Sequence, residues 1–229
     1  MKEISAVINA RLQSSRVPGK LVRPFAGSTL IQIALSKLDQ LHFFKHRYLA
    51  CAEEQLMQFA SDYANVEVLR RDMKSIRKGV NPLDVTLRHY LDVPTEWILV
   101  INPCQPLLSS ESLEKAFDLF QKTEYKSYIS VVPVRDWIFD QDGNPVTHKD
   151  VKVLATNKTT VHYKASHSFY IVNREHFRNT GLLWSFTRND PYLITISEEE
   201  TLDVDTELEF QITEEFYKRQ HKVANESVD

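Results

Sequence analysis

Apolar and polar positions alternate in blocks along the first half of the chain, and these blocks predict strands and helices in turn. An apolar run at residues 4–10 precedes apolar positions at helical spacing in residues 28–41, for which Ser28 is the expected N-cap. The same succession recurs three times and ends on a further strand. The other expected strands are 47–52, 66–69, 96–103 and 128–134, and the other expected helices are 53–63, 81–91 and 109–123. Strands that alternate with helices predict an α/β fold, with a mostly parallel sheet covered on both faces.

The second half of the chain has a different pattern. Residues 140–163 are polar, contain an Asp-Gly-Asn-Pro turn signal and lack helical periodicity, so we expect hairpin-like strands outside the main sheet. Apolar runs at residues 168–172 and 192–196 predict two more core strands. A closing helix is expected to begin at a capping box formed by Thr206 and Glu209.

Length and composition fit one domain that spans residues 1–229. Hydrophobic residues make up 42% of the chain, which allows a substantial core, and the net charge of -3 argues against an extended nucleic-acid partner. Cys51 and Cys104 lie in apolar surroundings, which favours reduced, buried thiols and a cytoplasmic protein. No apolar run approaches the roughly 20 residues that a membrane span needs, and the first residues are too polar for a signal peptide.

Three cations, Arg11, Arg16 and Lys20, lie in the loop between the first strand and the first helix. A loop of this kind can surround a triphosphate, because its backbone N–H groups and its cations both bind phosphate oxygens. Two common nucleotide motifs are excluded. Leu21 replaces the hydroxyl residue of a P-loop, and the dinucleotide fingerprint G-x-G-x-x-G is absent from a chain with only five glycines. On spacing alone, the three cations could equally be solvated loop charges.

The pattern A-R-x-x-S-x-R-x-x-x-K is present at Ala10, Arg11, Ser14, Arg16 and Lys20, within the sequence SSRVPGKL. In this pattern the loop resembles the cytidylyltransferases that make CMP-activated acidic sugars, and most closely their acylneuraminate and spore-coat-polysaccharide branch. The resemblance implies a Rossmann-like, three-layer nucleotidyltransferase fold with a small polar insert. It also implies that the loop binds the triphosphate of CTP, with Arg11 and Lys20 as the catalytic cations.

Two further stretches match family residues, one set for the nucleotide and the other for a metal. The Arg-rich end of the third strand and the turn after it match at Arg70, Arg71 and Asp84, which the resemblance assigns to the nucleotide. Asp203 and Asp205 match two family aspartates that bind a divalent metal, Mg²⁺ or Mn²⁺. Independently of the family, alternation places both carboxylates on one face of an extended chain, an arrangement typical of Mg²⁺ sites. The alternative is that both acids only favour the N-terminus of the following helix.

The acceptor side is assigned by the same resemblance. The stretch VINPCQPLL resembles a family strand end that faces the sugar, with Asn102 in place of the usual Gln. The acceptor is expected to contact Asn102, Gln105, Ser166, His167 and Tyr170. A lone histidine in the position of His167 is more often structural or on the surface than in contact with a substrate.

Several positions depart from the family pattern. Gln13 replaces a loop glycine, and the segment after the second strand lacks the usual acidic run. Residues 102–105 contain no acid, which favours the acylneuraminate-like branch over the Kdo-like branch. Trp137, Trp184 and Phe186 either wall the acceptor pocket or, as is more usual for aromatics at these spacings, belong to the core.

Together these patterns predict an enzyme in which an acidic acceptor attacks the α-phosphorus of CTP, releasing pyrophosphate and forming a CMP conjugate. Nonulosonic acids such as sialic, legionaminic or pseudaminic acid are the expected acceptors, with a phosphonate or another acidic sugar left open. A glycosyltransferase-like enzyme and a catalytically silent nucleotide-sugar-binding relative are the alternatives. Residues 136–165 are expected to be a dimerisation insert, because they are too few to bury a core and relatives commonly pair through such an insert.

Overall fold

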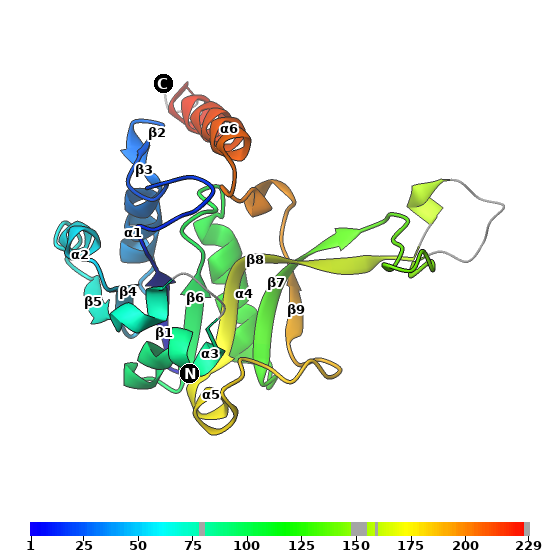
Figure 1. The fold of residues 1–229 in the computed structure, drawn as a ribbon, viewed down its shortest axis with the longest axis horizontal. Helices are drawn as coiled ribbons and strands as arrows, with labels where there is room; N and C mark the ends of the chain where they lie inside the picture. Colours follow the sequence, from blue (N-terminus) through cyan, green and yellow to red (C-terminus); the bar gives the residue numbers. More distant parts are fainter. Residues whose placement is uncertain (78–80, 148–154, 159, 227–229) are drawn as a thin grey trace.

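A seven-stranded mixed sheet forms the centre of the molecule (Figure 1). The computed structural model describes residues 1–77, 81–147, 155–158 and 160–226. The sheet contains β1 (Ile4–Asn9), β4 (Arg47–Cys51), β5 (Glu67–Arg70), β6 (Trp97–Ile101), β7 (Ser127–Val134), β8 (His162–Asn173) and β9 (Tyr192–Thr195), and a separate pair is formed by β2 (Pro24–Phe25) and β3 (Ser28–Thr29). The order is β5-β4-β1-β6-β8-β7-β9, and neighbours are parallel except that β8 is antiparallel to β6 and β7. The expected α/β fold with a mostly parallel, mixed sheet is confirmed.

Helices and turns cover both faces of this sheet. They are α1 (Leu30–Gln40), α2 (Glu54–Ala60), α3 (Leu83–Thr86), α4 (Ser110–Lys122), α5 (Arg174–Thr180) and α6 (Glu207–Glu226), with 3₁₀ turns at Met73–Ile76, Arg88–Asp92, Thr156–Lys158 and Glu199–Thr201. Side chains of α1, α2 and α4 form the larger core on one face, and Tyr90 and Phe177 contribute to a smaller core on the other. In β1, Ala6 and Ile8 join the larger core and Val7 joins the smaller one, as strand alternation requires. The molecule therefore has three layers.

The start of α1 and the presence of α5 differ from expectation. Thr29, not Ser28, caps α1, because Thr29 Oγ1 accepts a hydrogen bond from the Gln32 backbone N–H at 3.2 Å. Ser28 belongs to the extended pair β2–β3 instead. Helix α5 has no counterpart among the expected elements, although Asn173 caps its start and Gly181 ends it in the left-handed conformation at φ 69°.

The helix expected over residues 81–91 is split in two. Leu87, at φ -111° and ψ 17°, separates α3 from the 3₁₀ turn that follows. The Thr86 carbonyl accepts a hydrogen bond from Arg71 Nη2 at 3.2 Å, and Tyr90 is buried in the smaller core. These tertiary contacts override the helical periodicity, since propensity is only a weak determinant of structure.

Strands β7 and β8 extend beyond the body of the molecule as a two-stranded arm, drawn in green and yellow-green at the right of Figure 1. Strand β8 begins at His162, inside the polar segment 140–163, and pairs with β7 from there on. The expectation that this whole segment lies outside the main sheet is therefore wrong at its end. The predicted turn is present, with Gly143 at φ 81°. Residues 148–154 and 159 of the expected insert lie outside the described residues.

The crossover of the sheet places a crevice beside β1. The chain leaves β1 toward β4 on one side and later returns to β6 on the other, so the loops at the carboxyl ends of β1 and β6 diverge. In open α/β sheets ligands bind in the crevice at such a switch point. The loop with the three predicted cations begins there, at Ala10, and the predicted acceptor segment begins there at Asn102.

Two further expectations can be compared with the structure. The capping box at the start of α6 is confirmed, because the Glu209 backbone N–H donates to Thr206 Oγ1 at 3.2 Å and the Glu209 carboxylate accepts from the Thr206 hydroxyl at 2.9 Å. Cys51 is buried and Cys104 is partly exposed, and both are free thiols. Within the described ranges, no helix has the length and apolar character required to cross a membrane.

Candidate active site

A cavity of about 210 Å³ opens at the carboxyl ends of β1 and β6. It is lined by Asn9, Arg11, Gln13, Ser14, Ser15, Arg16, Lys20, Leu21, Asn102, Pro103, Cys104 and Asp205. The structure thus brings together predicted site residues from three separate segments: the loop after β1, the end of β6 and the start of α6.

The loop after β1 is held in place by contacts along its length. The Leu12 backbone N–H donates to Glu53 Oε1 at 2.9 Å, which ties the loop to the segment after β4. Val17 is fully buried and anchors the middle of the loop in the larger core. Gly19 adopts φ 65°, a left-handed conformation that a side chain would strain, and it directs Lys20 back toward the cavity. These contacts fix the conformation of the loop against the rest of the fold.

Asp205 carries two ion pairs to the predicted loop cations. Its Oδ2 atom lies 2.8 Å from Arg16 Nη2, and its Oδ1 atom lies 3.0 Å from Lys20 Nζ. The Lys20 side chain is only 13% exposed. Burial lowers the pKa of Lys20, but Cys104 and Asp205 together outweigh burial, so the net pKa is raised and the lysine stays cationic. The cavity thus has a permanent positive charge opposite a carboxylate.

Asp203 lies deeper and is less completely paired. Its Oδ2 atom accepts hydrogen bonds from Asn102 Nδ2 at 3.1 Å and, more weakly, from Gln105 Nε2 at 3.5 Å. Its Oδ1 atom is buried and has no hydrogen-bond partner among the described residues. Burial, and next the charge of Asp205, raise the pKa of Asp203 above its usual range. A buried carboxylate oxygen without a donor is costly unless a cation or water binds it.

The two carboxylates fit a divalent cation of the magnesium type. Asp203 offers an unpartnered oxygen, and Asp205 supplies a second carboxylate that is partly exposed to the same region. The described residues contain no group of three or more Asp, Glu, His or Cys side chains within ligating range of one another. Mg²⁺ commonly binds through one or two carboxylates and completes its shell with water and substrate phosphates. Asp203 and Asp205 are therefore the residues that such an ion would bind, with Asp205 exchanging its ion pairs to Arg16 and Lys20 for the metal.

A bulge in β8 shapes the next part of the site. The register between β7 and β8 shifts between the pairs Ile129–Tyr170 and Val131–Ala165, so Ser130 alone faces residues 166–169. Ser130 Oγ replaces the missing ladder bonds: it accepts from the Ser166 hydroxyl at 2.7 Å and from two backbone N–H groups of the bulge at 3.1 Å. Bulges next to active sites commonly redirect side chains.

The bulge carries two predicted acceptor residues, Ser166 and His167, is followed directly by a third, Tyr170, and contacts a fourth, Gln105. Gln105 is buried, and its Nε2 atom donates to the Ser166 carbonyl at 2.7 Å. His167 is exposed at φ 58°, and its Nδ1 atom lies 2.6 Å from the Tyr170 hydroxyl. Burial, together with the nearby charge of Asp203, raises the pKa of Tyr170 to about 12. Gln105 thereby joins the bulge to Asp203, and His167 contacts Tyr170 on the outer side of the bulge.

The remaining predicted nucleotide residues lie outside the cavity lining. Arg70 is exposed and pairs with Glu54 at 3.2 Å. Arg71 points the other way: burial lowers its pKa, its guanidinium lies near Arg11, and its Nε atom is buried without a partner in the described structure. Asp84 is exposed and accepts a hydrogen bond from the next backbone N–H. Of these three, only Arg71 is directed toward the site.

Sequence reasoning missed a buried polar network behind β1. Asn9 Nδ2 donates to the Tyr90 hydroxyl at 2.6 Å, and Asn9 Oδ1 lies 2.7 Å from His89 Nε2. Burial, and next the charge of Arg71, lower the pKa of His89 to about 3, so this histidine is neutral. A polar residue at the end of an apolar strand, Asn9, was the available signal. Glu53 and Ser130 were missed as well, because their roles depend on contacts between distant segments.

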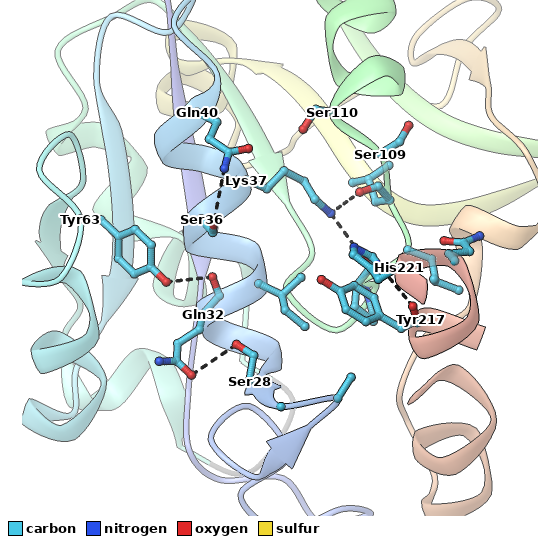
Figure 2. A pocket seen from close by; sticks show the side chains of 17 residues that line it. Ser28, Gln32, Ser36, Lys37, Gln40, Tyr63, Ser109, Ser110, Tyr217 and His221 are labelled. Atoms are coloured by element: carbon cyan, nitrogen blue, oxygen red, sulfur yellow. Dashed lines mark hydrogen bonds between the residues drawn. The ribbon is translucent and has the colours of Figure 1, made fainter. Parts of the chain in front are cut away.

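A second, larger cavity of about 710 Å³ lies behind the loop that follows Cys104 (Figure 2). Its walls come from α1, the segment from Pro106 to Ser110 and the end of α6. Lys37 extends from α1 into this region, where its Nζ atom donates to the carbonyls of Pro106 and Leu108. Burial lowers the pKa of Lys37 to about 8, despite the opposing charge of Glu200.

A family model and two known proteins align with nearly the whole chain. Residues 5–223 match the family model described as Cytidylyltransferase. The chain is 26% identical over 237 residues to the post-translational flagellin modification protein B of Campylobacter coli, an alignment that covers 99% of this chain and 100% of the relative. It is 28% identical over 224 residues to the CMP-N,N'-diacetyllegionaminic acid synthase of Legionella pneumophila, with 92% and 94% covered.

Solved structures show the same fold. The structure of CMP:2-keto-3-deoxy-manno-octonic acid synthetase complexed with CTP aligns with a TM-score of 0.69 and 12% identity, covering 96% of this chain and 100% of that chain. The 4-diphosphocytidyl-2C-methyl-D-erythritol synthase from Anaerococcus prevotii aligns with a TM-score of 0.67 and 12% identity, covering 95% and 99%. At this identity the likeness establishes the fold alone.

Proposed function

The chain belongs to the cytidylyltransferase family and is a CTP-dependent nucleotidyltransferase, and from that premise we propose that it transfers CMP to a nonulosonic acid such as sialic, legionaminic or pseudaminic acid. The observation that carries the proposal is the cavity in which Arg16 and Lys20 oppose Asp205, next to the buried Asp203. It unites cations for a triphosphate with carboxylates for a metal. The relatives named above support the acceptor class, because one of them is a CMP-diacetyllegionaminic acid synthase.

In the proposed reaction a hydroxyl oxygen of the acceptor attacks the α-phosphorus of CTP. A new phosphorus–oxygen bond forms, the bond from the α-phosphorus to the bridging oxygen breaks, and pyrophosphate leaves. The proton of the acceptor hydroxyl passes to solvent water. Arg11, Arg16 and Lys20 neutralise the triphosphate and the negative charge that develops on the leaving pyrophosphate. Ser14 and the backbone from Ala10 onward position the same phosphates. Arg71 extends the nucleotide site, with Arg70 and Asp84 at its exposed edge.

Asp203 and Asp205 are the residues that would hold Mg²⁺ or Mn²⁺. Such an ion supplies charge neutralisation at the phosphates and helps to orient them. Asn102 and Gln105 contribute by fixing the Asp203 carboxylate, through the hydrogen bonds to its Oδ2 atom. The unpartnered Oδ1 atom is thereby kept directed away from these amides.

The acceptor would lie on the β8 side of Asp203. His167 and Tyr170 present imidazole and hydroxyl groups there, and a sugar acid offers hydroxyls and a carboxylate to match them. Ser166, which was predicted to contact the acceptor, is buried, and its hydroxyl donates to Ser130 Oγ, so its role is to hold the bulge. Asn102 and Gln105 line the boundary between this region and the metal ligands. The proposed order along the site is therefore triphosphate, metal, acceptor.

The arm supports a proposal of dimerisation through residues 136–165. Its described part exposes Trp137, Phe139 and Val146, at 38%, 57% and 55% exposure, without a core to cover them. Apolar side chains gathered on a projecting element are typical of an interface between copies. Light scattering at micromolar concentration should give the mass of a dimer, and a monomeric mass would contradict the proposal.

Pyrophosphate release tests the proposed function directly. The protein would be incubated with Mg²⁺, a panel of acidic sugars and either CTP, ATP, GTP or UTP. We expect release with CTP and a nonulosonic acid, together with a CMP-sugar detectable by mass spectrometry. Equal thermal stabilisation by all four nucleotides, or CTP binding without turnover of any acid, would contradict it.

A further inference from the structure

Helix α6 carries apolar side chains on two faces, and only one of these faces is covered by residues that the structure describes. On the inner face, Phe210 is buried and packs edge-on against Phe25, with the ring centroids 5.3 Å apart. The ring of Tyr217 contacts Phe25 as well, at 5.7 Å between centroids. These contacts attach α6 to the segment that follows the cationic loop, and they occupy one stripe of the helix.

The outer face of α6 consists of three apolar residues that recur at every fourth position. Leu208, Ile212 and Phe216 are 65%, 42% and 44% exposed. Together with Gln211, Glu215 and Arg219 they line an open hollow of about 280 Å³. A helix on the surface of a monomer normally has one apolar stripe, with polar residues opposite. Since exposed patches of this kind mark interaction sites, the second stripe indicates that a partner covers the outer face.

The charges along α6 indicate which partner fits. Every charged residue from Glu207 to Glu215 is acidic, whereas Lys218 and Arg219 make residues 216–221 basic. Two parallel copies of the helix would bring like charges and like ends of the helix dipoles together. Two antiparallel copies instead place the basic part of each helix beside the acidic part of the other, and their dipoles oppose each other. The outer face is therefore complementary to itself in the antiparallel orientation.

We propose that the outer face of α6 is an interface with a second copy of this chain, in which the two helices cross antiparallel on a two-fold axis at Ile212. About this axis Ile212 meets its counterpart, and Leu208 of each copy packs against Phe216 of the other. Residues four apart form the ridge that interdigitates when two helices cross at about -50°. Arg219, which pairs with Glu215 at 3.1 Å within its own helix, then points toward the acidic start of the other helix.

The α6 contact is separate from the proposed arm interface. Figure 1 shows α6 at the upper edge of the molecule, apart from the arm formed by β7 and β8. One chain can therefore form both contacts at once, and copies then associate beyond a dimer. Three apolar residues in each copy make a small contact relative to the roughly 1,600 Å² of a standard interface, so this association depends on protein concentration.

Ile212→Glu tests the contact in solution. The substitution places a charge at the centre of the interface, yet the fold should stay intact because Ile212 is exposed and Glu is a good helix former. At submillimolar concentration we expect light scattering to give at least a twofold lower mass than for the unmodified protein, with the same circular dichroism spectrum. The fall is from tetramer to dimer if the arm interface also forms, and from dimer to monomer if it does not.

Leu83→Glu is the matched control, because Leu83 is 41% exposed and also lies in a helix, α3, but not on this face. It should retain the mass of the unmodified protein. An unchanged mass for Ile212→Glu overturns the inference, as does an unmodified protein that never exceeds the mass of this variant, since another partner would then cover the face.

Cysteine cross-linking tests the antiparallel geometry. On the two-fold axis, Ile212→Cys should form a disulfide with its counterpart under mild oxidation and give a dimer band on a non-reducing gel. Leu208→Cys should not cross-link to itself, because the two sites lie about 12 Å apart along the helices and a disulfide needs Cα atoms within about 7 Å. A mixture of Leu208→Cys and Phe216→Cys should cross-link. The unmodified protein, with its two native cysteines, is the control. Cross-linking of Leu208→Cys with itself, or none for Ile212→Cys, overturns the proposed pairing.

Discussion

The two cavities described above each contain a lysine, and the larger of them is not the candidate active site. In the smaller one, Lys20 pairs with Asp205, an exchangeable partner that a phosphate can replace, and it also donates to the Val204 carbonyl. In the larger one, the donors of Lys37 are engaged by the backbone carbonyls of Pro106 and Leu108 (Figure 2). Lys20 is therefore a charge available to a ligand, whereas Lys37 holds a turn in place. The smaller cavity is the candidate site because its lysine can exchange a carboxylate for a ligand, although the other cavity has the larger volume.

Removal of the Lys20 ammonium should have the largest effect. Lys20→Ala should reduce transition-state stabilisation by about 2–4 kcal/mol, the usual cost of losing one stabilising donor in a dry site, and kcat/KM for CTP should fall accordingly. The melting temperature should fall only moderately, because the substitution removes the Asp205 ion pair and the hydrogen bond to the Val204 carbonyl but no apolar core contact. Steady-state kinetics and a thermal scan check both parts. Normal CTP affinity and turnover of the Lys20→Ala protein would show that the loop cations are solvated surface charges without a role in the reaction.

Substitution of the carboxylates should have the next largest effect. Asp203→Asn and Asp205→Asn preserve size but remove a ligand charge, so we expect each to lose at least about tenfold in activity, or about 1.4 kcal/mol of barrier. Higher Mg²⁺ should partly rescue the less affected variant. The alternative role, favouring the start of α6, predicts no loss, since Asn is itself a good cap. Full activity of both variants at limiting Mg²⁺ would establish that alternative.

Lys37→Met should reverse the pattern of the Lys20 substitution. Two carbonyls lose a charged donor, and because water in the cavity can replace part of that bonding, we expect a decrease of about 1 kcal/mol in the free energy of unfolding. Turnover at 25 °C should stay within about threefold of the unmodified protein. Lys45→Met is the control, since Lys45 forms a surface pair with Glu3 and should have less effect. A large loss of activity without loss of stability would show that the two lysines do not differ as described.

The lowered pKa of Lys37 should also make stability depend on pH. The pKa of Lys37 is lowered from 10.5 to about 8 in the folded protein, so between these values the unfolded chain binds more protons than the native protein. The free energy of unfolding of the unmodified protein should therefore rise with pH relative to Lys37→Met, by at most about 1.4 kcal/mol per pH unit. Urea unfolding at pH 7.5, 9 and 10 measures this difference. Parallel curves for the two proteins would contradict it.

The parts of the site that could be predicted are those that one short segment defines. Arg11, Arg16 and Lys20 follow a recognisable strand, and strand ends in an α/β sheet place such a loop at the ligand crevice. Asp203 and Asp205 were found for the same reason, because their alternation is local. The fold class followed from periodicity alone, since buried parallel strands and amphipathic helices have distinct repeats.

The parts that could not be predicted depend on contacts between distant segments. Arg70 and Arg71 are adjacent in sequence, yet one pairs with Glu54 at the surface and the other is partly buried and donates to the Thr86 carbonyl. Because side chains alternate along a strand, the sequence predicts that Arg70 and Arg71 lie on opposite faces of the sheet. It does not predict which face is nearer to the ligand. Glu53 and Ser130 likewise act through the loop after β1 and the bulge in β8.

The bulge at residues 166–169 also bears on how proteins of this architecture can diverge. A one-residue change of length in a regular strand would move every following side chain to the opposite face. Here the pairs on either side of the bulge fix the register independently, and Ser130 holds the extra residues from across the ladder. Insertions, deletions and substitutions in this short stretch can therefore change the proposed acceptor contacts while the register of the sheet is kept. The bulge thus allows the proposed acceptor side of the site to vary separately from the loop after β1.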